Sequence, residues 1–307
     1  MAITADKIWM DGELVAFADA KIHVLSHTLH YGLGAFEGIR CYQRADGRRA
    51  IFRLSEHIKR LFETSHIATI DVPWKAAELE NACAETVRAN GFQSCYIRPV
   101  VFLGHGEMGL GALSNKVRVA IIAWAWDSYL GEEGIRDGIR AKVSSFNRHS
   151  VNSSMVKGKI NGQYVNSILA KREVMAMGYK EAIMLDGEGY VSEASGENIF
   201  VVKDGEIYTT PQGSSILSGI TRHTILTLAR ERGYSITEQR FTRDVMYVAD
   251  EVFMTGTAAE LTPVREVDNR TIGTGKPGPI TTELQTAYFD QVKGSAMDHL
   301  EWLTFVE

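Results

Sequence analysis

The sequence predicts two α/β domains with a cleft between them. Short apolar runs of strand length alternate with amphipathic helical segments throughout the 307 residues, of which 45% are hydrophobic. A chain of this length can bury two separate cores. The apolar pattern breaks at residues 127–134, where two glycines and several polar residues indicate a linker. We therefore expect a small N-terminal α/β domain (1–126), an interdomain loop (127–134) and a larger C-terminal domain (135–307), with a small ligand in the cleft.

The N-terminal half has the pattern of mixed strands and helices. Ser55 is placed to cap a helix over residues 55–69. Pro73 precedes a second helix over residues 75–90, which Gly91 closes. Strands are expected near residues 8–9, 14–15, 39–42 and 50–52, and over residues 95–103 and 117–125.

The C-terminal half begins with a strand over residues 139–146. An amphipathic helix follows over residues 164–177, with Gly178 as its C-cap. Asp186-Gly187 and Asp204-Gly205 are hairpin signals between β-rich runs. The remaining expected elements are helices over residues 221–232, ending at Gly233, and 282–292, and strands over residues 189–194, 235–240 and 251–254.

Lys159, Tyr164 and Glu193 supply three groups that pyridoxal phosphate (PLP) requires. An amine must form a Schiff base with the aldehyde, a phenol can hydrogen-bond the ring oxygen O3′, and a carboxylate must keep the pyridine nitrogen protonated. Tyr164 lies in the first turn of its expected helix and can reach back toward Lys159. Lys157 has no partner placed in this way, so Lys159 is the better candidate. Residues 194–196, after Glu193, are small and let a flat ring approach.

Taken singly, each of these residues has an ordinary explanation. A lone lysine is far more often a solvated surface residue than a nucleophile, and Glu193 alone would be a strand-end surface charge. Two downstream segments strengthen the combined interpretation. Residues 217–221 open a helix, whose N–H groups and positive dipole end suit a phosphate. Residues 255–258 form a small-residue turn that can present further N–H donors.

Five segments resemble the branched-chain amino-acid aminotransferases, which are fold-type IV PLP enzymes. The segments are residues 26–32 with 36–40, residues 96–99, the pair Lys159 and Tyr164, residues 190–200 and residues 250–258. They stand in family order, with nearly family-like spacing, from about Trp9 to Tyr288. Gln163, where the family often has Asn, and Ala194, where it often has Gly, bear on fine tuning only. The resemblance implies a mixed α/β (α+β) fold of two domains with the cofactor in the interdomain cleft.

The resemblance also implies the contacts of the cofactor. Lys159 carries the Schiff base and moves the proton between the substrate Cα and the cofactor C4′. Glu193 holds the pyridinium, Tyr164 positions O3′, and Arg60 reaches the phosphate through a charge-assisted bond. Without the family match, Arg60 would be a surface arginine. The other cofactor-binding residues implied are Gly219, Ile220, Thr221, Gly256 and Thr257.

The same resemblance implies one substrate site for two kinds of side chain, aliphatic and acidic. The α-carboxylate meets Tyr96 and the N–H groups of Thr257 and Ala258. Arg98, with the hydroxyls of Tyr31 and Tyr129, takes the distal carboxylate of glutamate. The apolar pocket is lined by Phe36, Tyr31, Trp126, Tyr129, Met108 and Leu110, of which Tyr31, Met108 and Leu110 reach in from a neighbouring subunit.

The function implied is PLP-dependent ping-pong transamination between L-leucine, L-isoleucine or L-valine and 2-oxoglutarate. Its products are branched-chain 2-oxo acids and L-glutamate, and the assembly is a homodimer or a trimer of dimers. D-amino-acid aminotransferases, R-selective amine transaminases and aminodeoxychorismate lyases share the fold and are the nearest alternatives. Tyr96, Arg98 and residues 36–40 favour the first interpretation. The ranking of the three donors and a biosynthetic or degradative role stay open.

Composition argues against several other partners. A formal charge of −5 and a pI near 6.0 argue against nucleic acid. The first residues lack the charged start and apolar run of a signal peptide, and the longest apolar stretch, residues 119–126, has only strand length. We therefore expect neither export nor a membrane span. Cys41, Cys83 and Cys95 form no CxxC pair and no disulfide framework, which suits a cytoplasmic enzyme.

Two further motifs suggest other functions and are set aside. Residues 104–109 match GxGxxG after a strand, but a second strand follows instead of the helix that must hold a pyrophosphate. His23, His27 and His30 stand at i, i+4 and i+7, which on a helix could bind the zinc of a hydrolase. Nearby glycines argue against a long helix, so we expect no metal and histidines that hydrogen-bond within a core loop. A non-catalytic PLP carrier is the other formal alternative.

Overall fold

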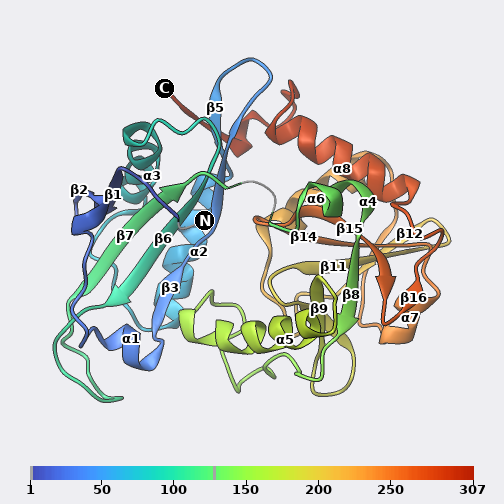
Figure 1. Ribbon diagram of the computed structural model, residues 1–307, viewed down its shortest axis with the longest axis horizontal. Helices are drawn as coiled ribbons and strands as arrows, with labels where there is room; N and C mark the ends of the chain where they lie inside the picture. The colour runs from blue at the N-terminus through green and yellow to red at the C-terminus, as the bar shows by residue number, and fades with distance from the viewer. Residues whose placement is uncertain (1–2, 127–128) are drawn as a thin grey trace. The chain divides into compact units, whose positions relative to one another are not determined.

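The computed structural model describes residues 3–126 and 129–307 (Figure 1). Backbone contacts divide the chain into two compact units. The first unit contains residues 3–126, 158–163 and 291–307, and the second contains residues 129–157 and 164–290. The segments 158–163 and 291–307, which the sequence division assigns to a C-terminal domain, thus group with the first unit. Residues 127 and 128 of the expected interdomain loop lie outside the described residues.

The first unit is built on an antiparallel sheet. Its strands are β1 (Lys7–Met10), β2 (Glu13–Ala16), β3 (Gly34–Phe36), β4 (Ile39–Gln43), β5 (Arg49–Phe52), β6 (Cys95–Leu103), β7 (Val117–Trp124) and β17 (Leu303–Val306). Within the described residues, their order is β17-β5-β4-β6-β7-β1-β2, with β3 paired to β6. β6 and β7 stay in register from Tyr96↔Trp124 to Leu103↔Val117. Tyr96 and Arg98 both lie in the first half of β6, two residues apart, and so project from the same face of the sheet.

Two helices pack on this sheet. α2 (Leu54–Ile67) and α3 (Ala76–Ala89) contact each other, and α3 also contacts β1, β6 and β7 (Figure 1). Apolar residues recur every three or four positions along both helices, so one side of each is buried in the core. The remaining helical turns of this unit are α1 (His27–Tyr31), η1 (Phe17–Asp19), η2 (Asn161–Gln163) and η3 (Leu300–Trp302).

The start of α2 differs from the prediction. The helix begins at Leu54, so Ser55 lies inside its first turn and does not cap it. The preceding residue is Arg53, whose φ of 53° lies in the left-handed region, and its Nε donates to Glu56 Oε1 at 2.7 Å. The sharp turn at Arg53 lets the helix start earlier, and a serine signal alone does not reveal such a turn.

The second unit is built on a mixed sheet. Its strands are β8 (Ile139–Val143), β9 (Glu181–Leu185), β10 (Val191–Ala194), β11 (Asn198–Lys203), β12 (Glu206–Thr209), β13 (Ile236–Glu238), β14 (Glu251–Gly256), β15 (Glu260–Val267) and β16 (Arg270–Thr271). Among the described residues, the order is β10-β9-β8-β15-β14-β11-β12-β13, and β16 pairs with β15. β8 runs parallel to both β9 and β15. This arrangement brings β10 and β11, which carry Glu193 and Asn198, onto the same sheet as β14.

The helices of the second unit are α4 (Glu132–Asp137), α5 (Tyr164–Ala176), α6 (Ile220–Glu231), α7 (Arg243–Tyr247) and residues 279–290 of α8 (Pro279–Val292). α5 packs on β8 and β9, and α6 packs on β13 and β14. Gly178 and Gly233 follow α5 and α6 with φ of 83° and 79°, the left-handed conformation expected at helix ends. No helix in the described ranges combines the length and apolar character that a membrane crossing needs.

The two predicted hairpins form by different means. Asp204 and Gly205 both have positive φ, 51° and 82°, and join β11 to β12 in the two-residue turn that such a pair favours. The loop between β9 and β10 is longer. There, Asp186 Oδ1 accepts from the N–H groups of Glu188 at 2.9 Å and Tyr190 at 3.0 Å.

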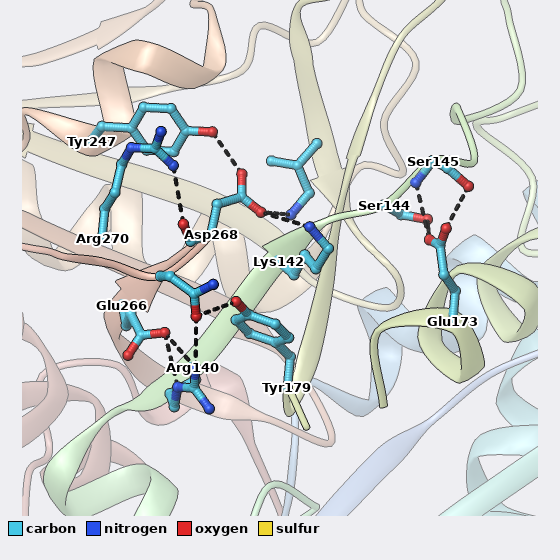
Figure 2. A network of polar contacts seen from close by, with 12 residues as sticks. Arg140, Lys142, Ser144, Ser145, Glu173, Tyr179, Tyr247, Glu266, Asp268 and Arg270 are labelled. Carbon is cyan, nitrogen blue, oxygen red and sulfur yellow. Dashed lines mark hydrogen bonds and ion pairs between the residues drawn. The ribbon is translucent and has the colours of Figure 1, made fainter. Parts of the chain in front are cut away.

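A network of polar contacts fixes the end of β8 (Figure 2). Asp268 Oδ1 accepts from the last N–H of β8 at 3.0 Å, and its Oδ2 accepts from the Tyr247 hydroxyl at 2.6 Å. Immediately after the strand, the hydroxyls of Ser144 and Ser145 each donate to Glu173 of α5 at 2.5 Å. The chain that leaves β8 is therefore held to both the sheet and α5 as it runs toward Arg148.

Candidate active site

Lys159 is anchored within the first unit through its backbone. Its N–H donates to Thr64 Oγ1 of α2 at 3.0 Å, and its carbonyl accepts from the Phe36 N–H of β3 at 3.2 Å. The next residue, Ile160, forms a bridge with Ala35. Lys159 Nζ lies 4.9 Å from the centroid of the Phe36 ring. A helix and a strand thus fix the backbone of Lys159. An amine that must reach one reacting carbon needs such a fixed position.

Lys157 is placed quite differently. Its Nζ donates to the carbonyls of Gln212, Ser214 and Ile216 at 2.5, 3.3 and 2.9 Å, all within the second unit. An ammonium group has three donors, and these carbonyls accept from it in the loop before α6. Burial lowers the pKa of Lys157, and the charge of Glu193 opposes that shift. This arrangement gives Lys157 a structural role and favours Lys159 as the reactive amine.

Arg60 forms a buried ion cluster with Glu37 and His57. Its Nε and Nη2 donate to the two oxygens of Glu37 at 2.6 and 2.9 Å, and His57 Nδ1 lies 2.7 Å from Glu37 Oε2. Burial alone would raise the pKa of Glu37, but the charge of Arg60 and the hydrogen bonds from His57 and Arg60 hold it well below its usual range. An ionised carboxylate can only accept, so His57 Nδ1 is the donor. Burial lowers the pKa of His57 despite the charge of Glu37. Glu37 therefore orients Arg60, the residue expected to meet the phosphate.

Arg98 lies in a group of aromatic rings. Its guanidinium is 4.7 Å from the centroid of Phe36, 5.3 Å from Tyr96 and 5.8 Å from Trp124. Nη2 donates to the Tyr96 hydroxyl at 3.3 Å, whereas Nε is buried and has no hydrogen-bond partner among the described residues. Trp126 packs edge-on against Tyr96, with ring centroids 4.7 Å apart. The predicted residues Phe36, Tyr96, Arg98 and Trp126 are thus neighbours.

Gly38 is needed for this arrangement. A Cβ on Gly38 would lie 1.8 Å from the Tyr96 hydroxyl oxygen, which no side chain could tolerate. Gly38 belongs to the segment 36–40 that carries part of the family resemblance, and its requirement is steric.

The three residues expected from a neighbouring subunit are exposed. Tyr31, Met108 and Leu110 show 44%, 42% and 90% of their surface. The segments that carry them are joined, because His27 Nε2 lies 2.8 Å from the Gly109 carbonyl. His30 Nε2 lies 2.8 Å from the Val24 carbonyl, and the Leu25 N–H donates to His23 Nδ1 at 3.1 Å. All three histidines of the zinc alternative thus contact main-chain groups of these loops, and of the three only His27 is buried.

Glu193 is the best-defined acid of the second unit. Its side chain is buried on β10, where Arg148 Nε donates to its Oε1 at 2.8 Å. Its Oε2 accepts from Asn198 Nδ2 at 3.2 Å and from the Leu217 N–H at 3.0 Å. Three donors, one of them charged, stabilise the carboxylate form. A fixed, ionised acid is what a protonated pyridine nitrogen requires as a partner.

Asn198 connects Glu193 to the first predicted phosphate segment. Besides its bond to Glu193, its Nδ2 donates to the Leu217 carbonyl at 3.0 Å. A Cβ on Gly219 would lie 2.0 Å from Asn198 Oδ1, so only glycine fits before α6. Ile220 and Thr221 then form the first turn of the helix, whose N–H groups have no intrahelical acceptor. The carboxylate and the helix N-terminus are therefore held in one assembly.

The turn between β14 and β15 carries the second phosphate segment. Thr257 and Ala258 lie in it, and Gly256 pairs with Glu260 across its base. Glu260 is buried and adopts a φ of 56°, which costs a non-glycine residue about 1–3 kcal/mol. Thr255 Oγ1 is buried and makes no hydrogen bond to any described residue. Backbone strain and an unsatisfied hydroxyl are typical of a turn that meets a ligand.

Each unit carries part of the predicted set. The first holds Lys159, Arg60, Phe36, Tyr96, Arg98, Trp126, Tyr31, Met108 and Leu110, and the second holds Tyr164, Glu193, Gly219, Ile220, Thr221, Gly256, Thr257, Ala258 and Tyr129. Sequence reasoning did not assign site roles to Glu37, Arg148 and Asn198. Glu37 and Asn198 lie in segments 36–40 and 190–200, and their place in these motifs could have indicated a role in the site. Arg148 has none, because its contact with Glu193 spans 45 residues.

Comparison with known proteins identifies the family. The model of the family "Amino-transferase class IV" matches residues 34–267. The chain is also 55% identical over 300 residues to a branched-chain-amino-acid aminotransferase of Pseudomonas aeruginosa, covering 98% of this chain and 97% of that one. The chain belongs to the class IV aminotransferases.

Two solved branched-chain amino acid aminotransferases have the same fold. The Escherichia coli structure has a TM-score of 0.97 at 45% identity and covers 99% of this chain and 100% of that one. The structure from Thermoproteus uzoniensis with norvaline has a TM-score of 0.94 at 43% identity and covers 99% of this chain and 100% of that one.

Membership of this family confirms the mixed α/β fold and the aminotransferase class expected from the sequence. It also implies a pyridoxal phosphate cofactor, and the residues present fit one. The buried carboxylate of Glu193 accepts from Arg148, Gly219 leaves room for Asn198 at the start of α6, and the hydroxyl of Thr255 is unsatisfied among the described residues. A class IV aminotransferase needs groups of these kinds around its cofactor.

Proposed function

We propose that this aminotransferase transfers amino groups between leucine, isoleucine or valine and 2-oxoglutarate, with PLP bonded to Lys159 through a Schiff base. The observation that best supports this choice of substrates is the set of groups around Arg98. A guanidinium among three aromatic rings, with one buried nitrogen lacking a partner in the described chain, offers both apolar contact and a charge. An aliphatic side chain can pack on the rings, and a distal carboxylate can pair with the guanidinium.

We assign the cofactor contacts as follows. PLP, when bound, supplies an electron sink for the substrate carbanion. Lys159 Nζ moves the proton between the substrate Cα and the cofactor C4′. Glu193 accepts a hydrogen bond from the protonated pyridine nitrogen, and Tyr164, the first residue of α5, donates to O3′. The phosphate is held by Arg60, by the N–H groups of Ile220 and Thr221 and by Thr257, where Gly219 and Gly256 permit close approach of the backbone.

Substrate recognition follows from the remaining predicted residues. Tyr96 and the N–H groups of Thr257 and Ala258 bind the α-carboxylate. Arg98 binds the distal carboxylate of glutamate, with the hydroxyls of Tyr31 and Tyr129. The aliphatic side chain takes the same space against Phe36 and Trp126, together with Met108 and Leu110.

The smallest active unit we propose is a homodimer. A second copy of the chain would cover the exposed Tyr31, Met108 and Leu110 and bring them to its partner's substrate site. The support is the large exposed fraction of these apolar residues on two segments that a hydrogen bond joins. Light scattering should give at least twice the monomer mass of 34.1 kDa, and Leu110→Asp should lower both the mass and the activity.

The test of the proposed function combines a spectrum with a donor panel. The purified protein should show the visible absorbance of bound PLP and should consume leucine, isoleucine and valine with 2-oxoglutarate as acceptor. Lys159→Ala should abolish turnover and the absorbance of the covalently bound cofactor. Lys157→Ala is the matched control two residues away, and it should stay active although less stable, because three carbonyls lose their donor. The reverse behaviour of the two variants, or a donor panel that favours D-amino acids, would contradict the proposal.

A further inference from the structure

A buried ion pair between Lys171 and Glu181 contacts Ser195, which belongs to the same motif as Glu193. Glu181, the first residue of β9, is fully buried, and its Oε2 pairs with Lys171 Nζ of α5. Its Oε1 accepts from the Ala182 N–H at 2.8 Å and from the Ser195 hydroxyl at 2.5 Å. Both oxygens are therefore occupied, which fixes the ammonium of Lys171 from a strand of the sheet. The side chain of Lys171 is only 16% exposed.

A second acid belongs to the same cluster. The side chain of Glu197 is buried, and the Gly196 N–H donates to its Oε2 at 3.1 Å. Burial and the charge of Glu181 raise the pKa of Glu197 to about 8. Burial would lower the pKa of Lys171, but the pairing with Glu181 keeps it above its usual value. Near neutral pH, Lys171 is thus charged and Glu197 is mostly protonated.

The ammonium of Lys171 faces a residue of the proposed substrate site. Lys171 Nζ lies 5.0 Å from the centroid of the Tyr129 ring, within the range of a cation–π interaction. Tyr129 lies in a turn outside the strands and helices, and 38% of it is exposed. A ring in such a turn is not oriented by a sheet or helix. Lys171, in contrast, stands on α5 seven residues after Tyr164, two turns along the same face.

We propose that Lys171, held by Glu181, is a positioning residue that fixes Tyr129 and thereby sets how well the enzyme accepts its dicarboxylate substrates. The inference rests on the proposed function, in which Tyr129 helps to bind the distal carboxylate of glutamate. Lys171 itself does not contact the substrate. Its effect passes through the ring of Tyr129 and through a side-chain hydrogen bond with the same residue, so it selectively affects substrates that use the Tyr129 hydroxyl.

A purely structural role for the pair predicts a different result. A buried ion pair is weak support for stability, because desolvation offsets much of the attraction, and removing one partner alone leaves a buried charge. Lys171→Met would therefore damage the fold through Glu181 as well as through Tyr129. The double variant Lys171→Met/Glu181→Gln removes both charges and separates these effects.

The experiment measures the two half-reactions separately by single-turnover absorbance. In Lys171→Met/Glu181→Gln, the apparent Kd for glutamate and 2-oxoglutarate should rise about tenfold, which is the scale of one desolvated cation–π contact, while that for leucine should change by less than about threefold. Lys171→Arg keeps the positive charge and should recover most of the lost affinity. Arg172→Met removes the charge of the neighbouring residue on α5 and should change neither apparent Kd.

A double-mutant cycle tests the route through Tyr129. If Lys171 acts on substrates through this ring, adding Lys171→Met/Glu181→Gln to Tyr129→Leu should cause no further loss for 2-oxoglutarate. Additive losses, or equal losses for leucine and 2-oxoglutarate, would overturn the inference and assign the pair to the fold. If the unmodified enzyme itself fails to transaminate leucine with 2-oxoglutarate, the proposed function is refuted and this inference with it. Normal wild-type activity with unchanged Lys171 variants refutes the inference alone.

Discussion

Replacing Arg98 by methionine tests whether one site serves two kinds of side chain. Methionine has a similar length and can keep contact with Phe36, Tyr96 and Trp124, which lie 4.7–5.8 Å from the guanidinium. The positive charge and the bond to the Tyr96 hydroxyl are lost. The substitution therefore removes the electrostatic partner of an acidic substrate but leaves an apolar wall in its place.

The size of the effect follows from the partly buried setting of Arg98, whose Nε is fully buried. Truncating one partner of a buried charged hydrogen bond costs about 2–5 kcal/mol. We therefore expect kcat/KM for glutamate and 2-oxoglutarate to fall by roughly 30-fold or more. Leucine has no distal charge and gains nothing from a guanidinium, so its half-reaction should change far less.

The assay is single-turnover absorbance of each half-reaction, which separates leucine from glutamate without steady-state coupling. Arg118→Met is a matched control, because Arg118 lies on the neighbouring strand β7 and also stands over an aromatic ring, Phe102, at 5.7 Å. It should leave the leucine-to-glutamate ratio unchanged. If Arg98→Met weakens both substrates equally, Arg98 holds the α-carboxylate or the architecture, and the assignment of the distal carboxylate fails.

Two further predictions concern the acids of the second unit. Glu193→Gln should lower the rate by several orders of magnitude, since a neutral amide cannot keep the pyridine nitrogen protonated. The variant should also lose about 1–3 kcal/mol of stability, because the single amide oxygen cannot accept from Arg148, Asn198 and Leu217 together. Near-normal turnover would transfer this role to Glu197. Glu197 has a pKa of about 8 in the folded chain, against an ordinary value of 4.5, so the folded state binds the proton more tightly than the unfolded state. The resulting stabilisation is complete below pH 4.5 and is lost as the pH rises through 8. Melting temperatures of Glu197→Gln and the parent between pH 6 and 8.5 should therefore diverge, with the variant gaining as pH rises, and parallel curves would contradict the assignment.

Local signals predicted much of the fold. β6 spans Cys95–Leu103, the predicted residues 95–103, and the Asp204-Gly205 hairpin forms as its two positive φ values require. The helix from Tyr164 and the one from Ile220 were also predictable within one or two residues, because periodicity and glycine at the end are encoded in adjacent residues. Ser55 failed as a cap because the conformation of Arg53, not the serine, decides where α2 starts.

Long-range contacts were not predictable in this way. β8 pairs with β15 in parallel, and Arg148 finds Glu193, across stretches of chain that carry no matching local pattern. The grouping of residues 158–163 with the first unit has the same cause, since the bridge between Ala35 and Ile160 joins distant segments. For the site, residue types and spacing predicted Lys159 and Glu193 as candidates, but not the side chains that orient them. Those partners depend on tertiary packing, which propensity and motif do not encode.

The pairing of β17 with β5 affects how the polypeptide folds during synthesis. Residues 303–306 complete the sheet of the first unit beside β5, and Val306 is buried in its core. At about 5–20 residues per second, a ribosome needs roughly 10 to 40 s to travel from the first 126 residues to this strand. During that interval the nascent sheet has an unpaired edge at β5, which is a site for association with other chains. Residues 3–126 expressed alone should consequently be more prone to aggregate than the whole polypeptide.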